Sequence, residues 1–287
     1  MGAGRSVVVT GAGQGLGLAH AWEFARRGAR LVLNDVGDGV RVLAEEITAA
    51  GGQAVASTGD VADWAYAREL VRTAVDTYGT LDTLVNNAGI NRDRMLVTMT
   101  EHEWDQVLRV DLKGHFAPMR HAGAYWRDRA KAGSPVAARV VNTSSGAGLL
   151  GSVGQGNYAA AKAGIAVLTR IAAVEWARYG VLVNAIAPSA RTPMTEAVFA
   201  EAMARPTSGF DAMDPANVSP LVVWLGSAEA TVTGRVFEVS GGEVSLADPW
   251  RHGPPAVKDG RWEADELGPV IADLVAKSEP APPVYGA

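Results

Sequence analysis

The sequence contains no cysteine among its 287 residues. This absence excludes a disulfide framework and any metal site with thiolate ligands. Positive charge is not in excess either, because the formal net charge is −5, which argues against a nucleic-acid or anionic-membrane surface. No apolar run reaches the ~18 residues of a membrane span, and the early first strand leaves no room for a signal peptide. We therefore expect a cytoplasmic protein with no metal site that binds neither nucleic acid nor membrane.

Hydrophobic residues make up 48% of the chain, which is typical of a globular protein with a substantial core. Apolar runs predict strands over residues 6–10, 29–34, 53–57, 81–86, 137–143, 180–186 and 235–239. Helical spacing predicts helices over residues 15–27, 38–50, 62–78, 101–131, 157–178, 195–204 and 215–227. This alternation predicts an α/β fold, a single Rossmann-type doubly wound parallel sheet with helices on both faces. Ligands bind such a sheet at the carboxyl ends of its strands.

A glycine-rich turn, T-G-A-G-Q-G-L-G from Thr10 to Gly17, follows the first predicted strand and precedes a predicted helix. Glycines let the backbone approach a pyrophosphate closely, and the free N–H groups of a helix N-terminus attract it. The strand–turn–helix context therefore predicts a dinucleotide site. The candidate cofactor residues in this turn are Gly11, Gln14, Gly15, Leu16 and Gly17.

The second predicted strand ends at Asn34 and Asp35, the latter 18 residues beyond Gly17. A carboxylate at this place accepts hydrogen bonds from the ribose hydroxyls of adenosine and repels a 2′-phosphate. No arginine or lysine follows until Arg41. We therefore predict NAD rather than NADP as the cofactor. The alternative is that Asp35 is only a turn residue ahead of Gly37.

Tyr158 and Lys162 are four residues apart, and Ser145 precedes the tyrosine by thirteen residues. On a helix, the tyrosine and the lysine share one face. A tyrosine normally releases its proton only near pH ~10, and a neighbouring ammonium lowers that value. The three residues are therefore candidates for acid–base catalysis on an alcohol or carbonyl. A Tyr-x-x-x-Lys pair alone is more often a packed tyrosine beside a solvated lysine, so the assignment depends on the glycine-rich turn.

Six motifs in order resemble the short-chain dehydrogenase/reductase family. Besides the glycine-rich turn they are G-D-V at 59–61, N-N-A-G at 86–89, N-T-S-S at 142–145, Y-A-A-A-K at 158–162 and N-A-I-A-P at 184–188. The resemblance extends over about residues 4–245. It implies an enzyme that interconverts a secondary alcohol and a ketone by hydride transfer. It also implies a small-molecule substrate and a homodimer or homotetramer.

The resemblance implies further residue roles. Ser145, rather than Ser144, stabilises the substrate oxygen, and Lys162 also binds the nicotinamide ribose. Tyr158 and Lys162 thus join a set of implied cofactor residues that includes Asp60, Val61, Asn87, Ala88, Gly89 and Pro188, with Ile186 beside the nicotinamide. Two alternatives remain, since Asp60 is equally suited to cap the following helix and N-N-A-G is also a common turn sequence.

Two positions depart from the family pattern. Asp111 lies where many members have an asparagine that completes a proton relay. An ionised aspartate accepts hydrogen bonds but cannot donate them as an amide does. Asp111 is therefore a candidate catalytic residue, and the alternative is that it has no part in catalysis. The second departure, Pro188-Ser189 in place of Pro-Gly, precedes the substrate loop and leaves the substrate class open.

Closer similarity is to the (3R)-hydroxyacyl-CoA and 17-beta-hydroxysteroid dehydrogenase domain of peroxisomal multifunctional β-oxidation enzymes, in N-N-A-G-I-N-R-D-R-M-L from Asn86 and A-P-S-A-R-T-P-M-T from Ala187. It implies a 3-hydroxyacyl-CoA or steroid substrate. Arg92, Arg94 and Arg191 are candidates to contact CoA phosphates, or else ordinary solvated arginines. Two rival functions remain. One is a 3-oxoacyl-acyl-carrier-protein reductase, which usually prefers NADPH, and the other is a non-catalytic dinucleotide-sensing protein.

Composition divides the chain into a dehydrogenase domain, residues 1–245, and a C-terminal extension, residues 246–287. Prolines flank a possible helix over residues 267–277, and Trp250, Trp262 and Ile271 make the extension too apolar for a free tail. We predict that it packs on its own subunit or a neighbouring one, with a partly ordered appendage as the alternative. The segment from Arg191 to Pro215, which includes Phe199, is a candidate lid over an acyl chain or sterol, and an oligomer contact or ordinary helix packing are equal alternatives.

Overall fold

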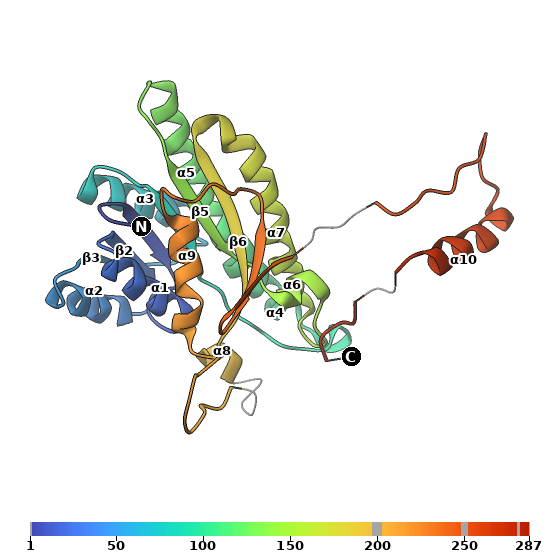
Figure 1. Cartoon of the computed structure of the whole chain (residues 1–287), viewed down its shortest axis with the longest axis horizontal. Helices are drawn as coiled ribbons and strands as arrows, with labels where there is room; N and C mark the ends of the chain where they lie inside the picture. The colour runs from blue at the N-terminus through green and yellow to red at the C-terminus, as the bar shows by residue number, and fades with distance from the viewer. Residues whose placement is uncertain (1, 197–202, 248–251, 280–281, 287) are drawn as a thin grey trace.

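The computed structural model describes residues 2–196, 203–247, 252–279 and 282–286. Its centre is an eight-stranded sheet in the order β3-β2-β1-β4-β5-β6-β7-β8 (Figure 1). The strands are β1 Ser6–Thr10, β2 Arg30–Asp35, β3 Gln53–Thr58, β4 Thr83–Asn86, β5 Ala138–Thr143, β6 Val181–Ser189, β7 Val236–Ser240 and β8 Glu243–Ala247. The first seven pair in parallel, and β8 pairs antiparallel with β7. This arrangement confirms the predicted doubly wound α/β fold.

Helices cover both faces of the sheet. They are α1 Gly15–Arg26, α2 Gly39–Ala49, α3 Trp64–Tyr78, α4 Glu101–Val107, α5 Gly114–Lys131, α6 Gly146–Leu150, α7 Gly156–Trp176, α8 Pro193–Glu196, α9 Ser219–Gly226 and α10 Leu267–Lys277. Because side chains alternate along a strand, β1 contributes to two cores. Val7 and Val9 pack with residues of α1, α2 and α9, whereas Val8 packs with residues of α3, α5 and α7.

Several predicted boundaries were wrong. The single helix predicted over residues 101–131 is divided into α4 and α5 by a π-helical turn, Leu108–Lys113, that contains Asp111. Such turns often occur at functional sites. The short helix α6 was not predicted. Of the helix predicted over residues 195–204, the described structure contains only the beginning, as α8, which starts at Pro193. Residues 197–202 lie outside the described residues.

The strand β8 was also missed, although Gly241 and Gly242 are a hairpin signal between two strands. The residues of β8 alternate between polar and apolar and are mostly exposed, so the strand lacks the apolar run from which the others were predicted. It extends to Ala247, so the predicted domain boundary at residue 245 falls inside a strand. The division into two domains otherwise stays a prediction.

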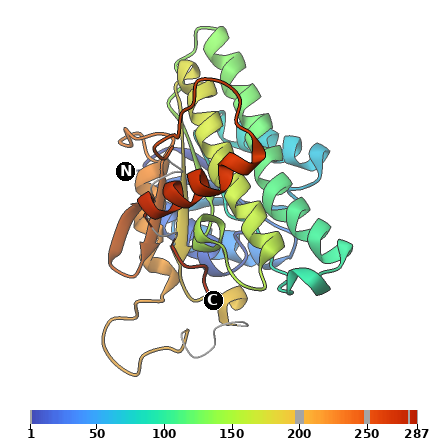
Figure 2. The same cartoon turned by 90° about the vertical axis from the view of Figure 1, so that its right-hand side faces the viewer.

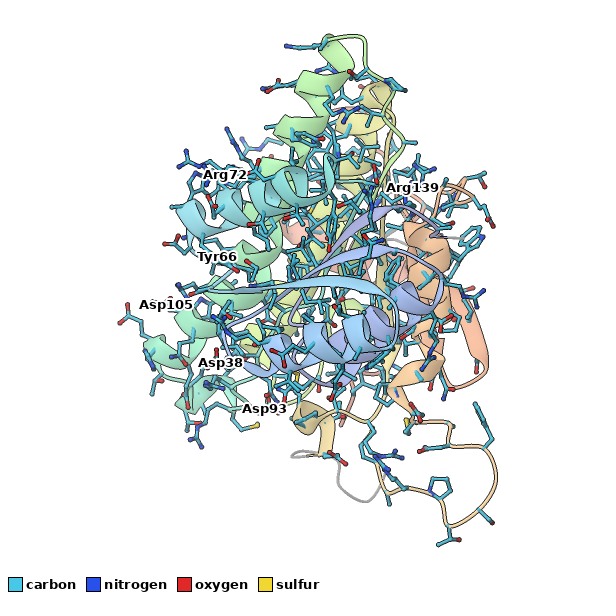
Figure 3. The ribbon with its side chains drawn as sticks, turned by 90° about the vertical axis from the view of Figure 1, so that its left-hand side faces the viewer. Asp38, Tyr66, Arg72, Asp93, Asp105 and Arg139 are labelled. Carbon is cyan, nitrogen blue, oxygen red and sulfur yellow. The ribbon has the colours of Figure 1, made fainter. Side chains whose placement is uncertain are left out.

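Side chains that follow the parallel strands lie together at one edge of the sheet. Asp38 follows β2 and Asp93 follows β4, whereas Arg139 is near the start of β5. Figure 3 shows the two aspartates on the side of the molecule opposite Arg139. The glycine-rich turn after β1 and Ser145 after β5 belong to the aspartate side, as predicted for a ligand site in such a sheet.

The C-terminal extension leaves the sheet–helix body and then returns to it. Figures 1 and 2 show α10 on the outside of the molecule, and α10 has no buried residue. The last described residues return to the loop after α6, where Val153 N donates to Tyr285 O at 2.9 Å. Trp250 lies outside the described residues. Packing of the extension on its own or a neighbouring subunit stays a prediction.

An apolar face of α7 is exposed. Val167, Ile171 and Val174, which are spaced along one side of this helix, are each about half exposed or more. Two surface hollows of about 700 and 600 Å³ lie here, the first between α5 and the end of α7 and the second among the π-helical turn, α5 and α7. The predicted homodimer or homotetramer stays a prediction. Among the described helices, none is both long and apolar enough to cross a bilayer.

Candidate active site

The glycine-rich turn is held against the end of β4. Gly11 has a φ of +63°, and a methyl group placed on it would lie 2.8 Å from the Cα of Ala88. A methyl group on Gly17 would overlap the carbonyl of Gly11. Only glycine fits these two positions without a shift of the backbone. The turn therefore has the close, bare backbone that a pyrophosphate site requires.

The N-terminus of α1 fits a bound anion. Gln14 is the N-cap, yet its side chain accepts no hydrogen bond from the first turn of the helix in the described structure. That turn, which contains Gly15, Leu16 and Gly17, has no acidic residue. Its N–H groups and the positive end of the helix dipole are thus available to phosphate oxygens. These residues fit a nicotinamide dinucleotide, and the individual contacts stay predictions.

Asp35 is the last residue of β2, and its side chain binds the glycine-rich turn. Its Oδ2 accepts a hydrogen bond from Gly13 N at 3.0 Å, and its Oδ1 accepts one from Val36 N at 2.7 Å. Among the described residues, no cation pairs with this carboxylate, because Arg41 pairs with Asp38 instead. Asp35 therefore organises the local turn and also places an unneutralised carboxylate beside the dinucleotide site. A role in the turn is therefore compatible with the predicted role of this carboxylate at the adenosine ribose.

Asp60 and Val61 follow β3. The carboxylate of Asp60 accepts a hydrogen bond from Ala62 N at 2.8 Å and pairs with Arg109. The alternative that Asp60 caps α3 is wrong, because Asp63 caps this helix by accepting from Tyr66 N. Val61 is buried. The implied roles of Asp60 and Val61 as cofactor residues are not tested by these contacts.

The N-N-A-G motif locks the end of β4 onto the glycine-rich turn. The Oγ1 of Thr10 accepts hydrogen bonds from Asn87 N at 2.9 Å and Ala88 N at 3.1 Å. In return, Asn87 Nδ2 donates to the carbonyls of Thr10 and Gly11. Gly89 lies directly over the acid–base residues, because a methyl group on it would lie 3.0 Å from Asp111 Oδ2. The motif thus links the two halves of the candidate site.

Tyr158 and Lys162 lie on α7 as the spacing predicted. The Nζ of Lys162 is 5.3 Å from the centre of the Tyr158 ring and donates to the carbonyl of Thr143 at 3.0 Å. Lys162 is buried, whereas Tyr158 is partly exposed. The phenol therefore reaches the site surface while the ammonium lies beneath it, an arrangement suited to stabilising a phenolate.

The two serines at the end of β5 differ in surroundings. The Oγ of Ser144 is buried and donates to the carbonyl of Lys162 at 2.8 Å, which is a structural role. Ser145 is partly exposed, begins α6 as its N-cap and accepts from Ala147 N at 3.2 Å. Its hydroxyl proton is not used in that contact. This difference supports the choice of Ser145 over Ser144 as the residue facing the substrate.

Asp111 forms a buried ion pair with Lys162, with 3.4 Å between Oδ2 and Nζ. Its other oxygen accepts from Ile90 N at 2.8 Å. Burial raises the pKa of Asp111, and the nearby ammonium only partly offsets this effect. Burial also works against the charge of Lys162, but attraction from Asp111 and Tyr158 outweighs it and raises the pKa of Lys162. The carboxylate thus keeps the lysine protonated in a buried place.

Ile186 lies in β6 and is fully buried in a core cluster, and its implied position beside the nicotinamide stays a prediction. The segment after β6 contains one correction. Arg191 is buried and forms a bidentate pair with Asp211 at 2.7 and 2.8 Å, so it is not free to contact CoA phosphates. Thr192 lies over the glycine-rich turn, since a methyl group on Gly15 would be 3.2 Å from it.

The other two candidate arginines are exposed. Arg94 pairs with Glu103 at 3.0 Å, and Arg92 donates to Gln106 at 3.2 Å. Both lie on the segment that follows the N-N-A-G motif. Their contact with a CoA phosphate stays a prediction.

Sequence reasoning missed some residues that shape the site. The carbonyl of Thr143 holds Lys162, and the hydroxyl of Thr10, a residue expected at a strand end, holds the N-N-A-G turn, a role that its sequence position does not reveal. His115 is buried one turn after Asp111. Burial, together with the charge of Lys162, holds the pKa of His115 well below 6.5, so this ring is neutral.

Comparisons with known proteins agree with this geometry. The family model described as short chain dehydrogenase matches residues 5–202. Hydroxyacyl-CoA dehydrogenase ChsB1 of Mycobacterium tuberculosis is 48% identical over 96% of this chain and 90% of that protein. Peroxisomal multifunctional enzyme type 2 of Mus musculus is 39% identical over 83% of this chain, and the chain spans only 32% of that protein.

A solved short chain dehydrogenase from Mycobacterium avium has 60% identity and a TM-score of 0.93 over 99% of both chains, so the likeness includes nearly all of the C-terminal extension. Full-length peroxisomal multifunctional enzyme type 2 from Drosophila melanogaster has 32% identity and a TM-score of 0.75, with 95% of this chain and 45% of that chain covered. With the family model matching most of the chain and the Ser145, Tyr158 and Lys162 motifs in place, the chain belongs to the short-chain dehydrogenase family of nicotinamide-dependent oxidoreductases.

Proposed function

We propose that the protein is an NAD-dependent dehydrogenase that interconverts a 3-hydroxyacyl-CoA and a 3-oxoacyl-CoA. The observation that supports it most is the Tyr158–Lys162 pair, with the ammonium buried 5.3 Å from the ring centre. The substrate class rests on likeness to a hydroxyacyl-CoA dehydrogenase over nearly the whole chain. A hydroxysteroid is the second candidate substrate, as the resemblance to the 17-beta-hydroxysteroid dehydrogenase domain implies.

A bound nicotinamide dinucleotide supplies the hydride chemistry of this reaction. In the oxidation, the phenolate of Tyr158 takes the proton of the substrate hydroxyl. Lys162 stabilises that phenolate electrostatically, and the hydroxyl of Ser145 donates a hydrogen bond to the substrate oxygen. In the reduction, the phenol of Tyr158 returns its proton to the same oxygen.

The choice of NAD follows from the charge at Asp35. Its carboxylate has no cationic partner among the described residues and ends the strand next to the glycine-rich turn. A 2′-phosphate at that place would meet a like charge, which costs several kcal/mol in a desolvated contact. This argues against a 3-oxoacyl-acyl-carrier-protein reductase, which usually prefers NADPH.

The rates of NADH consumption with different ketone substrates test the proposal. We expect NADH consumption with acetoacetyl-CoA and with longer 3-oxoacyl-CoA thioesters, and much slower consumption with a 17-ketosteroid or the matching acyl-carrier-protein thioester. Turnover of the steroid alone would replace the acyl-CoA assignment. Turnover only with the carrier-protein thioester would favour the reductase, and no turnover of any ketone would favour a sensor.

Replacing Asp111 by Asn should move the pH dependence of the reaction. The substitution removes the charge that raises the pKa of Lys162, while burial, which lowers it, remains. Lys162 should then lose its proton at lower pH. We expect the alkaline limb of the profile of kcat/KM against pH to move to lower pH.

The matched control for this experiment is Asp105→Asn, on the exposed side of α4. It removes the same charge from the same region without touching Lys162, so its profile should coincide with that of the unmodified protein. If the alkaline limb of the Asp111→Asn profile coincided with that of the unmodified protein, this carboxylate would not control the charge of Lys162.

A further inference from the structure

The loop between α6 and α7 joins the two catalytic candidates, because Ser145 precedes α6 and Tyr158 lies in the first turn of α7. Two distant parts of the chain hold this loop. On one side, Arg94 N donates to Gly154 O at 2.7 Å. On the other, Tyr285, near the C-terminus, lies in a β-bridge with Ser152. The C-terminal end thus contacts the loop that joins the two catalytic candidates.

Backbone hydrogen bonds fix this end in register with the loop. Val153 N donates to Tyr285 O at 2.9 Å, and Tyr285 N donates to Gly151 O at 3.3 Å. The side chain of Val284 also packs here, since a methyl group on Gly151 would lie 3.4 Å from its Cγ1. The C-terminal segment therefore pairs with the loop through its backbone, as a β-strand does, and not through one side-chain contact alone.

The ring of Tyr285 reaches the residue next to Ser145. A methyl group placed on Gly146 would lie 3.0 Å from Tyr285 Oη and 3.1 Å from Cε2. Contacts of 3.0–3.4 Å are tighter than most real methyl contacts. The absence of a side chain at Gly146 thus leaves the space in which the tyrosine ring lies, beside the serine proposed to face the substrate.

The surface around this ring is apolar and open. Leu150, Val153, Val284 and Tyr285 are all exposed, between 36 and 48% of their possible surface. None of the four bears a charge. An apolar surface that is left open beside a catalytic group is suited to a hydrocarbon group of a ligand rather than to phosphates.

We propose that the C-terminal segment Val284–Tyr285 is a wall of the substrate site and that Tyr285 determines specificity by contacting the acyl chain of the substrate. The identity of this group as an acyl chain rests on the proposed function. The C-terminal extension then has a role in substrate selection, because it delivers this segment to the loop between Ser145 and Tyr158.

Replacing Tyr285 by Ala tests the wall. We expect kcat/KM for 3-oxodecanoyl-CoA to fall about tenfold, mainly through KM, because an apolar contact of the bound chain is lost. With acetoacetyl-CoA, whose acyl chain offers only a terminal methyl group to an apolar wall, the change should be less than about twofold. The dissociation constant of NADH should not change. Val257→Ala, on an exposed part of the extension, is the control and should leave every value unchanged.

Two outcomes would overturn the proposal. Unchanged kinetics with the long substrate would remove Tyr285 from the site, and an equal loss at both chain lengths would show that it does not contact the acyl chain. If the unmodified protein turns over no acyl-CoA at all, the proposed function fails, and the kinetic comparison fails with it.

A second experiment needs no substrate. When Tyr285 is present, Gly146→Ala should lower the melting temperature of the protein, because the added methyl group crowds the tyrosine ring. In the Tyr285→Ala background, the same change should have a much smaller effect. Equal effects in both backgrounds would show that the ring does not lie against Gly146 in solution, whatever the substrate is.

Discussion

Tyr158→Phe should lower kcat for ketone reduction by about a hundredfold to ten-thousandfold, the usual range for a lost general acid or base. The substitution removes only the oxygen that exchanges the proton. The ring and the buried Lys162 remain, so NADH should bind with an unchanged dissociation constant, measured by fluorescence titration. This combination separates a catalyst from a dinucleotide-sensing protein on the same fold.

Tyr179→Phe is the matched control for this substitution. Tyr179 lies in the short 3-10 turn after α7, at the far end of that helix from Tyr158. It should keep full activity. If Tyr158→Phe retained kcat within about tenfold, the phenol would not be the proton donor. If it lost NADH binding together with activity, the tyrosine would be a structural residue of the dinucleotide site.

Asp35→Asn should shift the cofactor preference. Asparagine has nearly the same shape and keeps an oxygen that can accept from Gly13 N, so the turn should stay in place. The charge that repels a 2′-phosphate disappears, and the ribose hydroxyls lose a strong acceptor. We expect the ratio of kcat/KM for NADH to that for NADPH to fall by about ten- to a hundredfold.

The neighbouring Asp38 provides the control, because Asp38→Asn removes the same charge from an exposed side chain that pairs with Arg41. Its cofactor ratio should be that of the unmodified protein. A ratio that stays constant in Asp35→Asn, or that changes equally in both variants, would mean that Asp35 does not select the cofactor.

The fold could be predicted from the sequence because its signals are local. Buried strands such as β1 are continuous apolar runs, and Gly11 and Gly17 mark the turn that follows. The parts that were missed depend on tertiary contacts. The π-helical turn at Asp111 has no signal of its own in the sequence, and the exposed hairpin strand β8 has no continuous apolar run. The position of both follows from packing against the rest of the chain.

The site divides in the same way. Spacing along one helix was enough to bring Tyr158 and Lys162 together. It could not show that Arg191 is taken by Asp211, or that Tyr285 lies beside Gly146, because these partners are far away or unremarkable in the sequence. Ser145 and Ser144 are adjacent, and only their different burial separates the exposed hydroxyl from the structural one.

The most direct test of the central claim is the loss of absorbance from NADH, and separately from NADPH, with acetoacetyl-CoA as the substrate. The uncompensated carboxylate of Asp35 and the Tyr158–Lys162 pair predict rapid turnover with NADH and little with NADPH. Turnover mainly with NADPH would contradict the cofactor assignment and favour an acyl-carrier-protein reductase. Absence of turnover with either cofactor would contradict the proposed acyl-CoA chemistry.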